Sequence, residues 1–154
     1  MNRTPRNLAI RLALAAACVA LIGCNSPKQP ASGSFAAVRI QGHTAEQIRA
    51  TTVVAFQQEG YAFAGGQRPD MIFEKEASRW DQIAYGNWVD AAPVWLRVRA
   101  SVVPLHPDGF RLECQAYKVH NKGEQFGEEQ VALSKAHRKP YQALLDKVLA
   151  QMSR

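Results

Sequence analysis

The sequence predicts an α+β fold, a two-layer sandwich in which two helices cover a mostly antiparallel sheet of four to five strands. Residues 94–103 and 110–119 alternate between apolar and polar residues and are joined by a turn-forming segment, a pattern typical of a β-hairpin. Residues 44–59 and 140–152 carry apolar residues at helical spacing. The resulting order of strand, helix, strands and helix favours helices packed on a sheet.

The first helix follows a strand predicted over Phe35–Ile40 and begins after Thr44. Gln47 stands three residues later, so the pair predicts a capping box. Gly60 occupies the place where a left-handed residue ends many helices. The stripe that we expect to face the core consists of Ile48, Thr52, Ala55, Phe56 and Glu59.

The segment after this helix predicts two more strands. Tyr61–Ala64 runs into the turn-rich residues 65–70. Met71–Trp88 then supplies the neighbour of the 94–103 strand and turns near its Gly-Asn dipeptide. Pro93 has no backbone donor, so it must lie where the ladder needs none.

The turn positions also predict the ladder registers. The pairs that we expect are Val102–Phe110, Val98–Cys114, Arg99–Glu113, Glu76–Arg97 and Glu74–Arg99. They align Glu74, Arg99 and Glu113 in one charged row, in which each opposite-charge pair contributes about 0.2–1 kcal/mol. The same register turns Lys75 and Arg79 inward, so we expect a bulge or an early break in this strand.

The last helix is predicted to begin near Pro140, a residue that suits a first turn. The stretch before it, residues 120–136, is polar and contains two glycines, which indicates a long strand extension or a loop. Residues expected in solvent are Gln142, Asp146, Lys147 and Gln151. The apolar stripe consists of Tyr141, Leu144, Leu145, Val148 and Met152.

Residues 1–23 resemble a bacterial lipoprotein signal peptide. Three arginines precede the apolar stretch Leu12–Ile22, which is shorter than the roughly 20 residues that a membrane-crossing helix needs. Leu21-Ile22-Gly23-Cys24 resembles a lipobox, which implies cleavage between Gly23 and Cys24 and acyl chains, palmitate among them, on Cys24. Two or three chains give effectively permanent membrane attachment. An ordinary secretory signal is the alternative interpretation.

The rest of the chain divides into a tether and one domain. Residues 24–34 are rich in Pro and Ser and predict a flexible tether with a reach of about 35 Å. Residues 35–154 suffice for a single periplasmic α+β domain. Asn25, rather than Asp, follows the cysteine, and among lipoproteins this implies sorting to the outer membrane, on its periplasmic face.

Charge and cysteine content narrow the function classes. After residue 23, sixteen Lys and Arg stand against thirteen Asp and Glu, with the signs interspersed, so nothing favours nucleic acid as a partner.

Cys114 is the free thiol that is left once Cys18 is removed with the signal peptide and Cys24 is acylated. It alternates with apolar residues, which favours a buried structural role over a reactive one.

Catalytic and metal-binding patterns are poorly represented. The sequence contains no nucleophile elbow, phosphate-binding glycine loop, Cys-x-x-Cys or His-Glu-x-x-His motif, so we predict no enzyme, no cofactor and no metal site. His120, Glu124 and Glu128 have metal-ligand spacing on a helix, but Gly123 and Gly127 favour a solvated loop. An enzyme with a site assembled only in three dimensions remains a third alternative.

Trp80, Tyr85 and Trp88 gather around the predicted turn near residue 86. Large aromatics often cover the edge of a core, and this structural interpretation is the first alternative. The second is a partner-binding patch, because Trp and Tyr are enriched at binding hot spots.

The element order and the lipobox resemble the LPS-assembly lipoprotein family of Gram-negative outer membranes. The matching stretch is Phe35–Met152, and Leu21-Ile22-Gly23-Cys24 is the specific motif shared. We therefore expect a non-enzymatic accessory that binds or helps assemble an envelope protein. The alternative is a direct binder of lipid, glycan or peptidoglycan.

Overall fold

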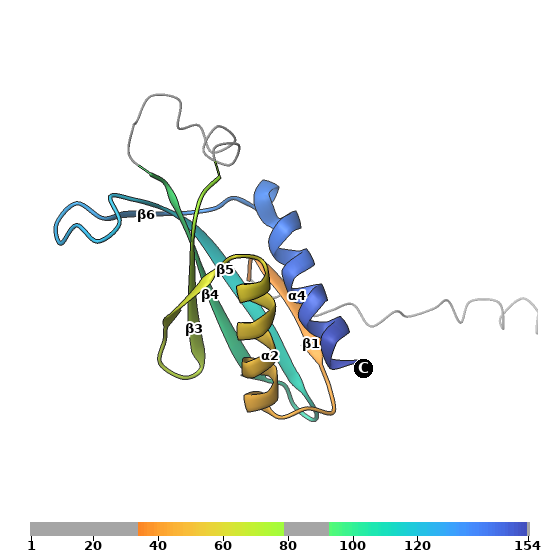
Figure 1. Ribbon diagram of the computed structural model, residues 1–154. Helices are drawn as coiled ribbons and strands as arrows, with labels where there is room; N and C mark the ends of the chain where they lie inside the picture. Colours follow the sequence, from red (N-terminus) through yellow and green to blue (C-terminus); the bar gives the residue numbers. More distant parts are fainter. Residues whose placement is uncertain (1–33, 79–92, 154) are drawn as a thin grey trace, which may run out of the picture. The chain divides into compact units, whose positions relative to one another are not determined.

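The computed structural model describes residues 34–78 and 93–153 and confirms the α+β fold. In these residues an antiparallel sheet packs against two α-helices (Figure 1). The elements are β1 (Ala36–Ile40), α2 (Ala45–Gln58), β2 (Ala62–Gly65), β3 (Asp70–Glu76), β4 (Trp95–Pro104), β5 (Phe110–His120), β6 (Glu129–Ala132), the 3₁₀ turn η2 (Lys135–His137) and α4 (Arg138–Met152).

The sheet has the strand order β1-β5-β4-β3-β2, and β6 extends it by pairing with β5. β1 pairs with residues 110–114 of β5 and β6 pairs with residues 117–120, so both line the same edge of that strand. β6 is one strand more than the predicted four to five. Of residues 120–136, predicted to be a long strand extension or a loop, only His120 extends β5, and the rest contains a turn, β6 and the start of η2.

The hairpin register differs from the prediction by two residues. Val102 pairs with Leu112, and Cys114 lies opposite Ala100 rather than Val98. The cause is the position of the turn, which is centred on Pro107 rather than His106 and is closed by a 2.9 Å hydrogen bond from the Leu105 N–H to the Gly109 carbonyl. An even shift leaves each side chain on its predicted face.

The β3–β4 register is also two residues from the prediction. Glu74 pairs with Arg97, so the predicted pairs Glu76–Arg97 and Glu74–Arg99 are wrong. The predicted row through Glu74, Arg99 and Glu113 does not form, since Arg99 lies between Ile72 and Gln115. Both predicted registers rest on assumed turn positions. The segment that connects β3 to β4 lies outside the described residues.

Lys75 lies on the helix-facing side of β3, as predicted, but the expected bulge is absent from the described ladder, which is continuous from Asp70 to Glu76. Its ammonium group donates a 2.8 Å hydrogen bond to the carbonyl of Glu59, the C-cap residue of α2. A lysine thus spans the edge of the core and donates to a carbonyl at the C-terminal end of the helix, where backbone acceptors lack partners within the helix. Arg79 lies outside the described residues.

Both helix predictions are confirmed. Thr44 and Gln47 form the capping box of α2, and Gly60 adopts a positive φ of 82° just after its end. Pro140 lies in the first turn of α4. The stripes of both helices bury the same residues that the sequence predicts, with Glu59 exposed and Met152 partly buried as the exceptions.

Gln142 departs from the prediction because its side chain is not simply solvated. Its amide accepts a hydrogen bond from the Ala37 N–H at 3.3 Å and donates one to the Ala37 carbonyl at 3.1 Å. β1 is an edge strand of the sheet. A side-chain amide of α4 therefore satisfies backbone groups that an exposed edge would offer to another chain.

Cys114 is buried in the core with 2% of its surface exposed, which confirms the structural interpretation of its position. Burial, assisted by the charge of Glu113, raises the pKa of the thiol from 9.0 to about 12. A thiol with so high a pKa is a poor nucleophile at neutral pH.

We expect Cys114→Ser to lower the free energy of unfolding by about 1–3 kcal/mol, because the hydroxyl is left incompletely hydrogen-bonded in an apolar site. Urea denaturation of the two proteins measures the difference. In parallel, a thiol reagent should label native wild-type protein only as fast as it unfolds. Rapid labelling of the folded protein at Cys114 would show that the side chain is accessible.

Candidate functional site

Two groups of predicted site residues lie outside the described residues. They are the lipidation and cleavage residues Gly23 and Cys24, and the aromatic cluster Trp80, Tyr85 and Trp88. The third group, His120, Glu124 and Glu128, is described. Its residues lie at the end of β5 and in the following turn, not on a helix, which agrees with the expected loop. Within residues 34–78 and 93–153, no cluster of three potential metal ligands is found.

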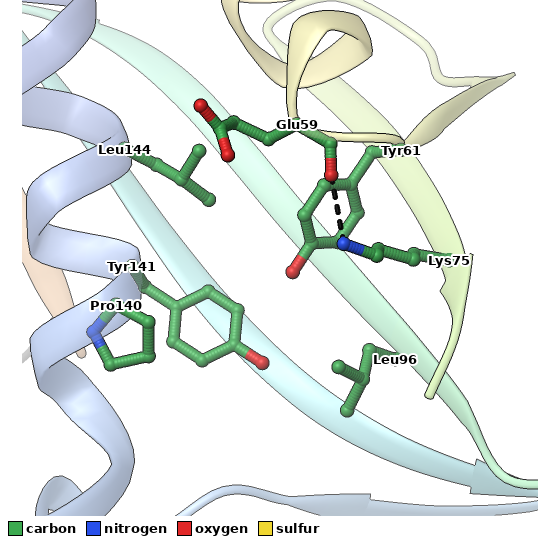
Figure 2. A pocket seen from close by; sticks show the side chains of 7 residues that line it. All are labelled: Glu59, Tyr61, Lys75, Leu96, Pro140, Tyr141 and Leu144. Atoms are coloured by element: carbon green, nitrogen blue, oxygen red, sulfur yellow. Dashed lines mark hydrogen bonds between the residues drawn. The ribbon is translucent and has the colours of Figure 1, made fainter. Parts of the chain in front are cut away.

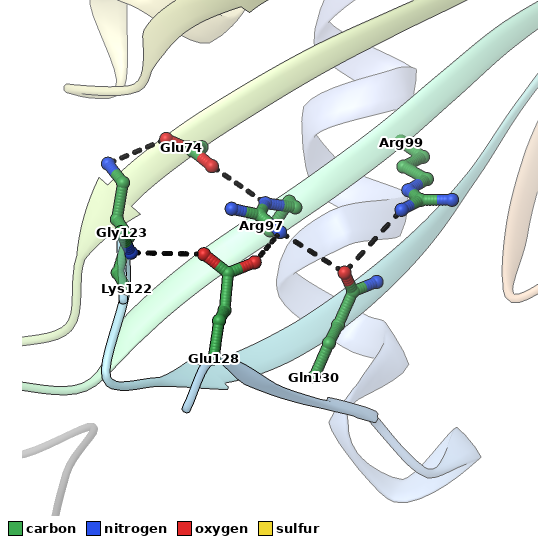
Figure 3. A network of polar contacts seen from close by, with 7 residues as sticks. All are labelled: Glu74, Arg97, Arg99, Lys122, Gly123, Glu128 and Gln130. Atoms are coloured by element: carbon green, nitrogen blue, oxygen red, sulfur yellow. Dashed lines mark hydrogen bonds and ion pairs between the residues drawn. The ribbon is translucent and has the colours of Figure 1, made fainter. Parts of the chain in front are cut away.

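The helices cover one face of the sheet, and the opposite face carries the most extensive polar network among the described residues. We call this the outer face. It displays Glu74 of β3, Arg97 and Arg99 of β4 and Tyr117 of β5. Lys122 and Glu128 of the β5–β6 turn, residues 121–128, reach onto it with their side chains (Figure 3). The side chains drawn in Figure 3 come from three strands and this turn, so distant parts of the chain build one surface.

Arg97 is the centre of the network. Its Nε donates to Glu74 Oε1 at 2.7 Å, and its Nη1 donates to Glu128 Oε1 at 2.6 Å and to Gln130 at 3.2 Å. Lys122 completes the set by pairing with the other oxygen of Glu74 at 2.6 Å. Arg97 and Glu74 are largely buried, with 15% and 10% of their side chains exposed. Such low exposure makes these ion pairs stronger than surface pairs.

The arrangement shifts the pKa of each carboxyl group. Burial raises the pKa of Glu74, but hydrogen bonds from Lys122 and Arg97 outweigh it, so the net pKa is lowered. The pKa of Glu128 is lowered first by its hydrogen bond from Arg97 and then by the Gly123 N–H. Both groups are therefore ionised at neutral pH and act as hydrogen-bond acceptors, not as proton donors.

The aromatic residues of the outer face support the cations. Lys122 Nζ lies 3.5 Å from the centroid of the Trp95 ring, and the Arg99 guanidinium lies 5.4 Å from that of Tyr117. Val119, on the same face and opposite Trp95, is 1% exposed. The turn thus covers a small apolar area of the outer face, and cation–π contacts of this kind contribute about 0.5–2 kcal/mol.

Sequence reasoning placed Arg97 on the outer face but missed the residues that surround it. Lys122 and Glu128 come from the turn that precedes β6, a short polar strand with little alternation. The available signal was the pair of glycines in residues 120–136, which indicated a turn but not where it would dock.

A second candidate is a pocket of about 230 Å³ on the helical side of the sheet (Figure 2). The hydroxyl groups of Tyr61 and Tyr141 point into it, and the ammonium group of Lys75 lies at its edge. Glu59 is tied to Lys147 at 2.8 Å, a hydrogen bond that lowers its pKa. The remaining lining residues are Leu96, Pro140 and Leu144.

No family model matches the chain, and no curated protein matches it. Among the described helices, none is long and apolar enough to cross a membrane.

Proposed function

We propose that this chain is a lipoprotein anchored to the outer membrane through Cys24, and that its periplasmic domain is a non-enzymatic binding or assembly accessory for an envelope protein. The observation that carries the binding role is the outer face. It is a sheet surface that neither helix covers, and its charges are fixed in position by ion pairs. A surface ordered before binding loses less conformational entropy when a partner docks.

The chemistry of the network supports recognition over catalysis. Both oxygens of Glu74 accept hydrogen bonds or ion pairs from Arg97 and Lys122. The lowered pKa values of Glu74 and Glu128 hold these groups in one protonation state near neutral pH. A general acid or base needs a pKa close to the working pH, whereas the pKa values of Glu74 and Glu128 are lowered, away from neutral pH.

The anchor supplies the first test. Cys24→Ser removes the acyl acceptor, so we expect either the uncleaved precursor or a form absent from the lipoprotein fraction. Membrane fractionation with metabolic labelling by a fatty acid measures both. A variant that matures and partitions with membranes like the wild type would show that the lipobox interpretation is wrong.

The binding role is tested by purifying the full-length lipoprotein from membranes in mild detergent and identifying co-purified proteins by mass spectrometry. We expect one envelope protein to be recovered in a fixed ratio.

The predicted aromatic patch is tested in the same assay with alanine variants of Trp80, Tyr85 and Trp88. Each should weaken the affinity for the partner about thirty-fold, and so reduce its recovery, if it is a hot spot. Lost stability with unchanged recovery would make the cluster structural.

A second candidate function, direct binding of lipid or glycan, is favoured by the pocket of Figure 2. Its leucine, proline and tyrosine surface suits a small apolar body, and Lys75 suits an anionic head group. Titration with octanoate, followed by the methyl NMR signals of Leu96 and Leu144, tests it. Saturable shifts that disappear in Lys75→Gln support this candidate, whereas linear shifts in both proteins oppose it.

A further inference from the structure

Phe126 is 96% exposed at the tip of the β5–β6 turn. The other large apolar residues that are exposed in the described part of the chain, Val54, Phe63 and Val131, range from 41% to 48%. A ring so exposed contributes nothing to the core of this domain. The turn that carries it extends beyond the sheet on the side away from α4 (Figure 1).

The turn itself is held by its own hydrogen bonds. The Asn121 side chain donates to the Gly127 carbonyl at 3.3 Å, and the N–H groups of Gly127 and Glu128 donate to the Glu124 carbonyl at 3.4 Å and 3.2 Å. Glu128 in turn accepts the Gly123 N–H at 3.1 Å. The backbone on both sides of residue 126 is thereby fixed.

Two ion pairs fasten the same turn to the outer face. Lys122 pairs with Glu74 and Glu128 pairs with Arg97, each at 2.6 Å. Largely buried charges of β3 and β4 are therefore used to hold a surface turn in place. An aromatic side chain presented from a fixed backbone has little conformational entropy left to lose on binding, which is the property of a binding anchor.

The charges around Phe126 indicate what it meets. Lys122 and Glu128 are engaged with the sheet, which leaves Glu124 and Glu129, within three residues of Phe126 in the sequence, as exposed acidic residues of this segment. Segments that insert into membrane interfaces are rich in Lys and Arg, because anionic lipids repel acidic side chains. An apolar pocket with cationic residues on its rim complements this tip, whereas an anionic lipid surface does not.

We propose that Phe126 is the anchor residue of the partner interface, and that it inserts into an apolar pocket of an envelope protein with a basic residue at the rim facing Glu124. This inference rests on the proposed function, since it names the contact by which the accessory holds its partner. Hot spots typically combine one buried aromatic ring with surrounding polar contacts that exclude water.

The test uses full-length lipoprotein in mild detergent and the protein that co-purifies with it. Phe126→Ala should weaken the affinity about thirty-fold or more, and the melting temperature should not change because the ring is exposed. Val54→Ala, which truncates a half-exposed residue of α2, is the matched control and should bind like the wild type. Glu124→Lys should slow association most at low salt.

The outcomes separate this inference from the proposed function. Wild-type recovery of a partner with unchanged affinity for Phe126→Ala overturns the anchor and leaves the accessory role intact. Recovery of no partner by the wild type overturns both. Equal losses for Phe126→Ala and Val54→Ala also overturn the anchor, because they indicate a general effect of apolar truncation.

A labelled variant distinguishes a protein pocket from a lipid surface. Phe126→Cys carries an environment-sensitive fluorophore, and Cys114 is too buried to compete for it. A blue shift that requires the partner supports the anchor. A blue shift on phosphatidylethanolamine–phosphatidylglycerol vesicles alone overturns it and assigns the tip to the membrane.

Discussion

Replacing Phe56 with alanine is expected to lower the free energy of unfolding by about 3–5 kcal/mol, the usual cost of removing a fully buried aromatic ring. Phe56 is 0% exposed. Its ring stacks on Phe73 of β3 with a centroid distance of 4.3 Å and meets the edge of Tyr61 at 5.5 Å. The side chain therefore joins the two layers of the fold, and its loss leaves a cavity between α2 and the sheet.

The expected loss is large compared with the total free energy of unfolding. Domains of this length are stable by about 5–15 kcal/mol, so the variant loses about 30–50% of a mid-range value of about 10 kcal/mol. Urea denaturation followed by circular dichroism measures the change, with Val54→Ala on the exposed side of the same helix as control. The control should stay within about 0.5 kcal/mol of the wild type. A loss below about 1 kcal/mol for Phe56→Ala would contradict the packing of α2 on β3.

The local sequence was sufficient to predict the helices and the faces of the strands. Thr44 and Gln47 define the start of α2 through contacts three residues apart, and Gly60 defines its end through its own backbone conformation. The alternation in β4 and β5 likewise assigns each side chain to a face. Each of these signals lies within a few residues of the structure that it determines.

Register could not be predicted in the same way. Both ladders are shifted by two residues from the prediction, and such a shift preserves the apolar face, so the hydrophobic pattern does not distinguish the alternatives. The distinction comes from turn length and from specific pairs such as Glu74 with Arg97. These pairs in turn depend on the register, which makes the problem circular at the level of sequence.

The outer-face network was hidden for a related reason. Arg97 meets Glu128 from 31 residues away, in a turn that joins β5 to β6. β6 is four residues long and mostly exposed, so its pairing follows from the position of β5 and not from any strong strand pattern of its own. Phe126 carries no sequence signal either. Only the fold shows that its ring is exposed.

Arg97→Met is expected to lower the free energy of unfolding at pH 7 by about 2–3 kcal/mol. Breaking a fully buried ion pair costs about 3–5 kcal/mol, and two features reduce that value here. The side chains retain 15% and 10% exposure, and Lys122 remains as a partner for Glu74. Methionine keeps most of the apolar stem, so the loss measured is chiefly that of the charge and its hydrogen bonds.

The pH dependence of that loss distinguishes electrostatics from packing. Glu74 and Glu128 have folded-state pKa values below 4.5, their ordinary value, so their contribution is fully present above pH 4.5 and is lost as the pH falls through the lowered values. The wild type and Arg97→Met should thus differ most near neutral pH and converge in acid below pH 4.5. Arg39→Met, which removes an exposed arginine bonded to the Asp108 carbonyl, should show no such convergence. Parallel stability curves for the wild type and Arg97→Met from pH 7 to pH 3 would mean that Arg97 acts through packing alone, and that the ion pairs do not hold the turn that presents Phe126.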